Sequence, residues 1–151
     1  MKKPLLVTLA AVLLLLGVTA PAAAAEPRHP DVEYAVSAVP GGTVVDAYTV
    51  VWPSLGMTLS VPRPFGRTAV GTCASGQFCA YSGPSLSGSK LSWSTCTTVR
   101  TAALSKVGSI ANARASGTVQ ARTAAGTVLA SAPAGGSASV VGAVATLRCV
   151  F

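Results

Sequence analysis

The stretch Cys73–Cys96, CASGQFCAYSGPSLSGSKLSWSTC, decides the fold of this chain. It contains three of the four cysteines, a corner with the pattern Tyr81-x4-Leu86-x-Gly88, and a run from Lys90 in which polar and apolar residues alternate. Alternation with a period of two is typical of a half-buried β-strand, and the Gly/Pro/Ser-rich segment before it indicates a turn. The stretch therefore predicts the start of a small β domain that disulfides hold together.

The N-terminus has the layout of a secretory signal peptide. Lys2 and Lys3 precede an apolar run, Leu5–Val18, and small residues follow this run up to Ala25. A membrane anchor would need about 20 apolar residues, and this run is shorter. We therefore expect residues 1–25 to be removed after Ala25 and the product to be secreted, with no membrane attachment after cleavage.

Four cysteines in an exported chain predict two disulfides, and sequence alone allows three pairings. Cys73 and Cys79 are close enough for a tight local loop, which favours a second pair of Cys96 with Cys149. In the loop-entropy model the long loop contributes about 4 kcal/mol and the short loop about 2.5 kcal/mol. A zinc site is the alternative, but the spacing is wrong and the only histidine, His29, lies near the N-terminus.

Glycine and proline turn signals divide the remaining chain into three parts. Residues 26–40 are expected to be a flexible leader, and residues 41–68 a β-hairpin with a Pro/Gly linker. The hairpin would use strands at 43–51 and 57–61, and it could pack on the domain, extend its sheet or act as a pro-segment. Residues 69–151 are expected to form the main domain.

Short strands with turns between them recur about every ten residues in this domain. They are expected at 90–95, at 137–141, at 144–148 and in the echoed pair GTVQA and GTVLA, residues 117–121 and 126–130. No segment has a convincing helical period with caps, and 97–106 is expected to be the longest connection. This spacing predicts an all-β fold, a small antiparallel β-sandwich, rather than a βαβ fold.

Charge is unevenly distributed along the chain. The four acidic side chains are Glu26, Asp31, Glu33 and Asp46, whereas the part from residue 69 onward carries only basic ones: Lys90, Arg100, Lys106, Arg114, Arg122 and Arg148. A basic protein can attract anionic cell-wall polymers or an acidic partner. Nucleic acid is not expected as a partner, because the basic residues are single and no aromatics are interleaved with them.

The residue inventory argues against an enzyme. A Ser-His-Asp site needs a base, and paired-carboxylate hydrolysis needs two acids, yet the main domain has neither histidine nor acidic side chain. A calcium site would usually include carboxylates. The sequence therefore predicts no catalytic residues, no metal and no cofactor.

The run CASGQFCAYSGPSLSG, residues 73–88, resembles the opening of the peptidase inhibitor family typified by the Streptomyces metalloproteinase inhibitor. The shared pattern is C-x-x-G-x-x-C-x-Y-x4-L-x-G, and the resemblance extends over about residues 69–149. It implies a βγ-crystallin-like fold with two Greek keys, in which Tyr81, Leu86 and Gly88 form a structural corner.

The resemblance also implies a secreted inhibitor that places a rigid loop in a protease cleft. The connection 97–106 is the loop to test first, with Val99, Arg100 and Leu104 as candidate contacts, and the alternative is that it is only a surface connection. The typical member has a second closely spaced cysteine pair in its later half, and this chain does not, so its inhibitory contacts do not transfer. The alternative is a non-inhibitory module of the cell envelope that binds anionic wall polymers. A monomer is expected in either case.

Overall fold

The computed structural model describes residues 27–64 and 73–151. The predicted signal peptide, residues 1–25, and the predicted domain boundary at residue 69 lie outside this described part, so both stay predictions. Within the described part, no helix is long and apolar enough to cross a membrane.

The described elements follow one another with short connections. In chain order they are α1 (Pro30–Ala38), β1 (Thr43–Asp46), β2 (Thr49–Trp52), the 3-10 turn Pro53–Leu55, β3 (Met57–Ser60), β4 (Phe78–Tyr81), β5 (Lys90–Trp93), β6 (Thr98–Arg100), β7 (Ser109–Asn112), β8 (Thr118–Arg122), β9 (Val128–Pro133), β10 (Ser137–Ser139) and β11 (Thr146–Val150). The predicted all-β fold class is confirmed.

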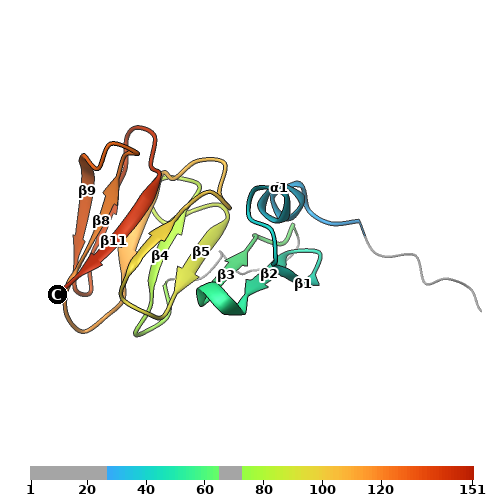
Figure 1. The fold of residues 1–151 in the computed structure, drawn as a ribbon, viewed down its shortest axis with the longest axis horizontal. Coiled ribbons are helices and arrows are strands. Elements are labelled where there is room, and N and C mark those ends of the chain that lie inside the picture. Colours follow the sequence, from blue (N-terminus) through green and yellow to red (C-terminus); the bar gives the residue numbers. More distant parts are fainter. Residues whose placement is uncertain (1–26, 65–72) are drawn as a thin grey trace, which may run out of the picture.

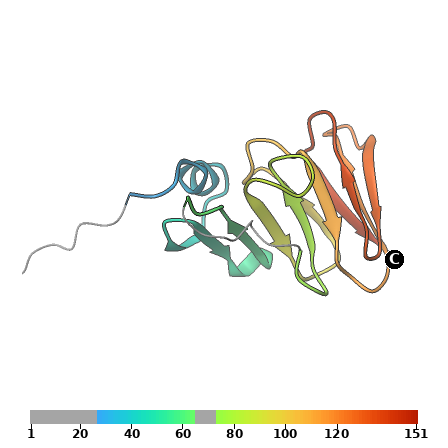
Figure 2. The same cartoon turned by 180° about the vertical axis from the view of Figure 1, so that it is seen from behind.

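The strands form two antiparallel sheets that lie face to face. In the described residues, the first sheet has seven strands in the order β1-β2-β3-β5-β4-β7-β10, and the second has four in the order β6-β11-β8-β9. Figures 1 and 2 show the second sheet at one end of the molecule, the first sheet beside it, and α1 with β1–β3 at the other end.

Each sheet takes one strand from the other half of the domain. β4, β5 and β7 are neighbours in the first sheet, while β6, which lies between β5 and β7 in the chain, pairs with β11 in the second sheet. In the same way β8, β9 and β11 are neighbours, while β10 pairs with β7. Two four-stranded units, each with its fourth strand beside its first, have the pattern of two Greek keys that exchange their third strands.

The core between the two sheets is small, and its aromatic side chains come from the first sheet. Phe78 and Trp93 stack with their ring centroids 5.4 Å apart, and both side chains are buried. The second sheet faces them with smaller buried side chains: Val119, Ala121, Leu147 and Cys149. Alternate residues of β8 and β11 therefore point inward, which fits the period of two in their sequences.

A second, separate cluster covers the opposite face of β4. Cys79 and Tyr81 are fully buried there, together with Cys73 and Ala111, and Leu86 packs against them. The turn that carries Leu86 is tied down because the Leu86 N–H donates to Ser109 Oγ at 2.9 Å, and Ser109 Oγ donates to the Gly83 carbonyl at 2.7 Å. The corner predicted at Tyr81, Leu86 and Gly88 is thus a turn folded back over the sheet.

Close backbone contact explains one glycine beside this turn. A Cβ atom on Gly108 would lie 2.6 Å from the Gly83 carbonyl carbon, and that backbone cannot move aside easily. The Gly108 N–H donates to the Tyr81 carbonyl at 2.8 Å, so the approach is part of the hydrogen-bonded structure.

The N-terminal part differs from the flexible leader expected at 26–40. Residues 30–38 form α1, whose Val32 and Ala35 side chains are fully buried. The helix begins after His29, whose Nδ1 accepts from the Asp31 N–H at 3.1 Å, and Pro30 suits the first helical turn because it needs no hydrogen-bond partner there. The expectation of no helix was wrong at this point.

The β-hairpin expected at 41–68 is a three-stranded unit that continues the first sheet. The strand predicted at 43–51 is interrupted after Asp46, where the Tyr48 N–H donates to Asp46 Oδ1 at 2.8 Å, and it becomes β1 and β2. β2 pairs with β3, and β3 pairs with β5 from Met57↔Trp93 to Ser60↔Lys90. Of the three arrangements left open for this segment, the described structure shows the extended sheet.

Candidate functional site

The connection 97–106, proposed from the sequence as the inhibitory loop, is mostly built into the fold. Val99 belongs to β6, pairs with Leu147 and packs partly buried on the core. Leu104 is only 6% exposed, so its side chain is unavailable to a protease. Arg100 is the one exposed side chain of the three candidates. Leu104 is therefore corrected from a contact residue to a core residue.

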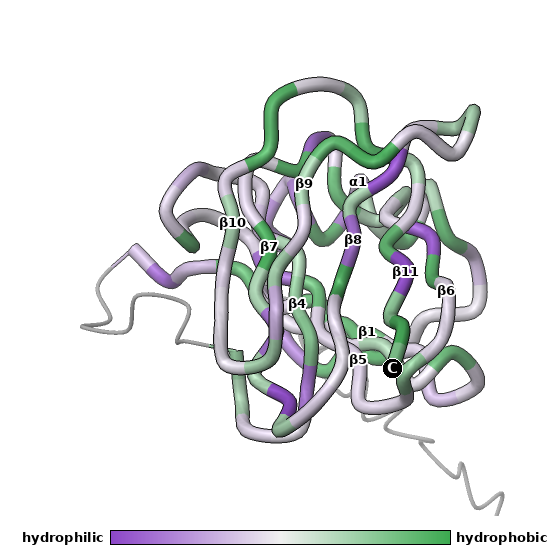
Figure 3. The backbone as a smooth tube through the Cα atoms, turned by 90° about the vertical axis from the view of Figure 1, so that its left-hand side faces the viewer, coloured by the Kyte–Doolittle hydropathy of each residue, from purple (hydrophilic) through white to green (hydrophobic). Residues whose placement is uncertain are grey.

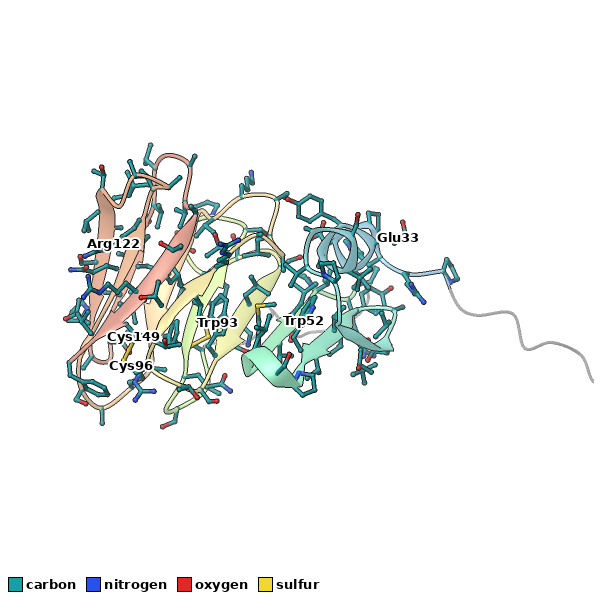
Figure 4. The ribbon with its side chains drawn as sticks, viewed as in Figure 1. Glu33, Trp52, Trp93, Cys96, Arg122 and Cys149 are labelled. Atoms are coloured by element: carbon teal, nitrogen blue, oxygen red, sulfur yellow. A yellow bond between two sulfur atoms is a disulfide. The ribbon has the colours of Figure 1, made fainter. Side chains whose placement is uncertain are left out.

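Two disulfides support the main domain. Cys73 is bonded to Cys79 with a Cα–Cα distance of 5.8 Å, and Cys96 to Cys149 with a distance of 5.1 Å. This is the pairing that the sequence analysis favoured. Figure 4 shows the second bridge beneath the second sheet, where it joins the segment before β6 to the end of β11.

Several connections meet at the opposite end of β11. The chain after β6, the β8–β9 turn at Ala124 and the segment before β11 line a groove of about 650 Å³, and Tyr34 of α1 also borders it. Two cationic side chains, Arg100 and Lys106, contribute to its lining. The groove brings together segments far apart in the sequence, so it is the region of the main domain where a partner would meet several connections at once.

The connection between β10 and β11, residues 140–145, is the apolar loop of this region; we call it the β10–β11 loop. Its sequence is VVGAVA, with no charged side chain. Val140 is buried and its N–H donates to the Gly108 carbonyl at 2.9 Å. At the other end, the Ala145 N–H donates to the Arg122 carbonyl at 2.9 Å.

Thr101 adds two further bonds to the end of this loop. Its N–H donates to the Ala145 carbonyl at 3.2 Å, and its Oγ1 donates to the Val144 carbonyl at 3.1 Å. Thr101 itself is buried, so water does not compete strongly for these bonds. The β10–β11 loop is therefore held at both ends by the body of the domain.

The middle of the loop projects outward. Val141 is 87% exposed, the highest value among the exposed large hydrophobic side chains of the described chain. Gly142 follows with a φ of 110°, a conformation that residues with a Cβ rarely adopt, and it sits beside the Leu129 side chain. A tight bend on a packed support thus presents an aliphatic side chain to the solvent.

The sequence analysis missed Val141 because it expected a strand over 137–141. β10 ends at Ser139, since Val140 pairs with the Gly108 carbonyl beyond the last residue of the ladder. Two adjacent valines look like strand core in a sequence, and the one available signal is the glycine that follows them. A glycine after an apolar pair indicates a turn rather than a continued strand.

The described residues offer little for catalysis or metal binding. No group of three His, Cys, Asp or Glu side chains lies close enough to hold a metal ion in the described part. The only histidine of the chain, His29, caps α1 through the Asp31 N–H, and the Asp31 carboxylate accepts a hydrogen bond from Ser89 Oγ.

The two sheets and the two disulfides define a small, disulfide-linked, all-β protein. Residues 66–125 match the model of peptidase inhibitor family I36, and this match supports the resemblance to a peptidase inhibitor family that the sequence analysis described. No curated protein and no solved structure gives a significant match. The term βγ-crystallin-like therefore stays a prediction, although the strand exchange fits two Greek keys.

The matched segment ends within the β8–β9 turn. It includes β4 to β8 and stops before β10, β11 and the loop between them. The family match thus supports a peptidase inhibitor and a protease partner, and the contact residues have to be argued from the structure.

Proposed function

We propose that this chain is a secreted inhibitor of a metalloprotease and that the β10–β11 loop is the segment that enters the protease cleft. The match to a peptidase inhibitor family supports inhibition. The observation that carries the choice of loop is Val141, an aliphatic side chain 87% exposed between two tethered ends.

A loop fixed before binding loses little conformational entropy on binding. The bonds at Val140, Val144 and Ala145 fix the ends of the β10–β11 loop, and Thr101 supplies two of them from the neighbouring connection. A flexible loop of the same sequence would have to be ordered in the cleft, at about 1–2 kcal/mol per residue. These hydrogen bonds therefore favour inhibition over slow cleavage, because they would also hold the two ends of the loop together if a protease cut it.

The chemistry of the loop favours one class of protease pocket. Val141 and its neighbours carry no charge, so they suit a primary pocket that takes an aliphatic side chain. A trypsin-type pocket contains an aspartate that pairs with a cationic side chain, and valine would leave this aspartate without a partner. The metalloprotease class comes from the sequence resemblance and agrees with an aliphatic contact residue.

The test is inhibition of three proteases by the purified protein: a thermolysin-type, a subtilisin-type and a trypsin-type enzyme. We expect saturable, stoichiometric inhibition of the thermolysin-type enzyme. Val141→Ala removes two methyl groups from the contact and should weaken inhibition about tenfold. Val141→Asp places a carboxylate in an apolar pocket and should weaken it by about a hundredfold or more.

Val128→Asp is the matched control, because Val128 is also an exposed valine but lies on β9, outside the loop. This control should inhibit as the unchanged protein does. Equal inhibition by Val141→Asp and the unchanged protein would show that the loop is not the contact. Selective inhibition of the trypsin-type enzyme would point instead to Arg100, the exposed member of the original candidates.

Secretion is the second part of the proposal. It is supported by the layout of residues 1–25 and by two disulfides, which persist in oxidising compartments. N-terminal sequencing of protein recovered from the medium should read from Glu26. Recovery only inside cells, with residues 1–25 retained, would contradict it.

A further inference from the structure

The outward face of the second sheet is basic, and we call it the arginine face. Leu147 and Cys149 of β11 point into the core, so Arg148 between them points outward. The register places Arg100 of β6 and Arg122 of β8 on either side of Thr146. Directly paired residues share one side of a sheet, so the three arginines lie on the same face.

The three arginines are spread over this face rather than gathered at a point. Neighbouring strands lie about 4.8 Å apart, so the backbones of Arg100 and Arg122 are separated by roughly 10 Å across β11. Arg148 is two residues farther along β11, a rise of about 7 Å. Such spacing exceeds one small anion and suits successive charges along an extended polymer.

No acidic side chain neutralises these arginines. Every acidic side chain of the sequence lies at or before Asp46, and the ion pair found in the described residues joins Asp46 to Arg63. The hydrogen-bond partner of the Arg122 side chain is the neutral Gln120, whose Oε1 accepts from Arg122 Nε at 3.1 Å and from Nη2 at 2.6 Å. This contact fixes one edge of the guanidinium group and leaves its charge uncompensated.

One row of the face is polar, whereas Val128 beside Arg122 is apolar. Thr98, Gln120 and Ser131 lie in one row with Arg148, and Figure 3 looks onto this side, where hydrophilic segments recur along β8 and β11. Asp31 and Glu33 lie on α1, and Figure 4 shows Glu33 at one end of the molecule and Arg122 at the other end, on the second sheet. Arg122 therefore lies far from the acidic side chains of α1, whereas Arg100 lines the groove that Tyr34 of α1 borders.

We propose that the arginine face binds an acidic polysaccharide. Guanidinium groups form paired hydrogen bonds with carboxylate or sulfate groups, and the threonine, serine and glutamine side chains of the face can bond to sugar hydroxyls. A flat face with spaced charges fits a chain lying across the strands. This inference goes beyond protease inhibition and does not rest on it.

Nucleic acid fits the face less well than an acidic polysaccharide. Single-stranded nucleic acid is held largely by aromatic side chains that stack on its bases. The outward positions of β6, β8, β9 and β11 carry no aromatic residue over Thr98–Arg100, Thr118–Arg122, Val128–Pro133 and Thr146–Val150. Double-stranded DNA attracts any basic surface through its phosphates, so it serves as a competing outcome in the test.

The test measures binding of the whole folded protein to polygalacturonate and to dextran sulfate, with neutral dextran and double-stranded DNA as comparison probes. No protease is present, so the result is independent of inhibition. We expect binding to the two acidic polysaccharides, none to neutral dextran, and strong weakening as salt rises from about 0.05 M to about 0.5 M. A preference between the two acidic probes identifies carboxylate or sulfate as the recognised group.

The triple variant Arg100→Gln, Arg122→Gln, Arg148→Gln should bind at least about tenfold more weakly, because three charge-assisted contacts are lost. The matched control, Arg28→Gln, Arg63→Gln, Lys90→Gln, removes the same charge from the N-terminal part and the first sheet, and it should bind within about twofold of the unchanged protein. Circular dichroism of both variants checks that they are folded. Equal loss in both triple variants would show attraction by net charge only and overturn the assignment, as would tighter binding to DNA than to either polysaccharide.

Discussion

Tyr81 places a phenol group inside the small cluster on the outer side of β4. Its side chain is fully buried among Cys73, Cys79 and Ala111. Burial raises the pKa of the Tyr81 phenol above its ordinary value of 10.0, and the backbone of Cys73 offsets part of this rise. The charged form of this tyrosine is therefore disfavoured in the folded protein.

This pKa shift predicts a loss of stability at high pH. Because the folded pKa lies above the unfolded value of about 10, the stabilising effect is complete below pH 10 and is lost as the pH rises toward the folded pKa. Urea unfolding measured across this range should show a falling free energy. Tyr81→Phe should flatten the fall, and an unchanged slope in this variant would contradict the assigned burial.

The corner shows what could be predicted for single residues and what could not. The spacing of Tyr81, Leu86 and Gly88 predicted a structural corner, and the structure forms one. It did not predict that Ser85 and Leu86 adopt positive φ angles of 52° and 60°. Non-glycine residues rarely do so, and here Leu86 is held by Ser109, a partner 23 residues away that no local pattern specifies.

The same reasoning explains why the sequence analysis did not select Val141, the proposed contact residue. Leu104 and Val141 are both aliphatic residues near turn signals, so composition ranks them alike. Their exposures are 6% and 87% because one chain segment packs beneath the sheet and the other bends away at Gly142. Only the tertiary arrangement separates them.

At the scale of elements, periodicity predicted which strands exist better than which strands pair. The repeated GTVQA and GTVLA segments became the neighbours β8 and β9, as expected of a hairpin. The sequence did not predict that β6 joins the second sheet and β10 the first. A period of two specifies which face of a strand is buried and does not specify which strand it pairs with. α1 was missed because it has nine residues and only a few buried positions, Val32 and Ala35 among them.

The two disulfides should differ in their effect on stability. Cys96–Cys149 spans 53 residues and Cys73–Cys79 spans 6, so the longer loop restricts the unfolded chain more. Replacing both cysteines of the long pair by serine should cost about 4 kcal/mol, against about 2.5 kcal/mol for the short pair. Urea unfolding of the two double variants would measure both losses, and a larger loss for the short pair would contradict the loop-entropy explanation.

At the scale of the whole molecule, the exchanged strands make the two Greek keys inseparable. A chain ending at residue 125, the end of the segment matched by the family, keeps β4 to β8 but leaves β6 without β11 and β7 without β10. We expect this shortened chain to be unfolded, with a random-coil circular dichroism spectrum and rapid proteolysis. A cooperative thermal transition in it would show that the first key folds alone.

The exchange also determines when this protein can fold during its synthesis. β6 cannot pair until β11 has been synthesised, and Cys96 cannot form its disulfide until Cys149 has been synthesised. A nascent polypeptide that ends before β11 therefore has an unpaired edge on β6 and a free thiol at Cys96. Contacts this distant in sequence form slowly, so we expect the chain to stay unfolded, and able to pass through a secretion channel, until β11 and Cys149 reach their partners β6 and Cys96.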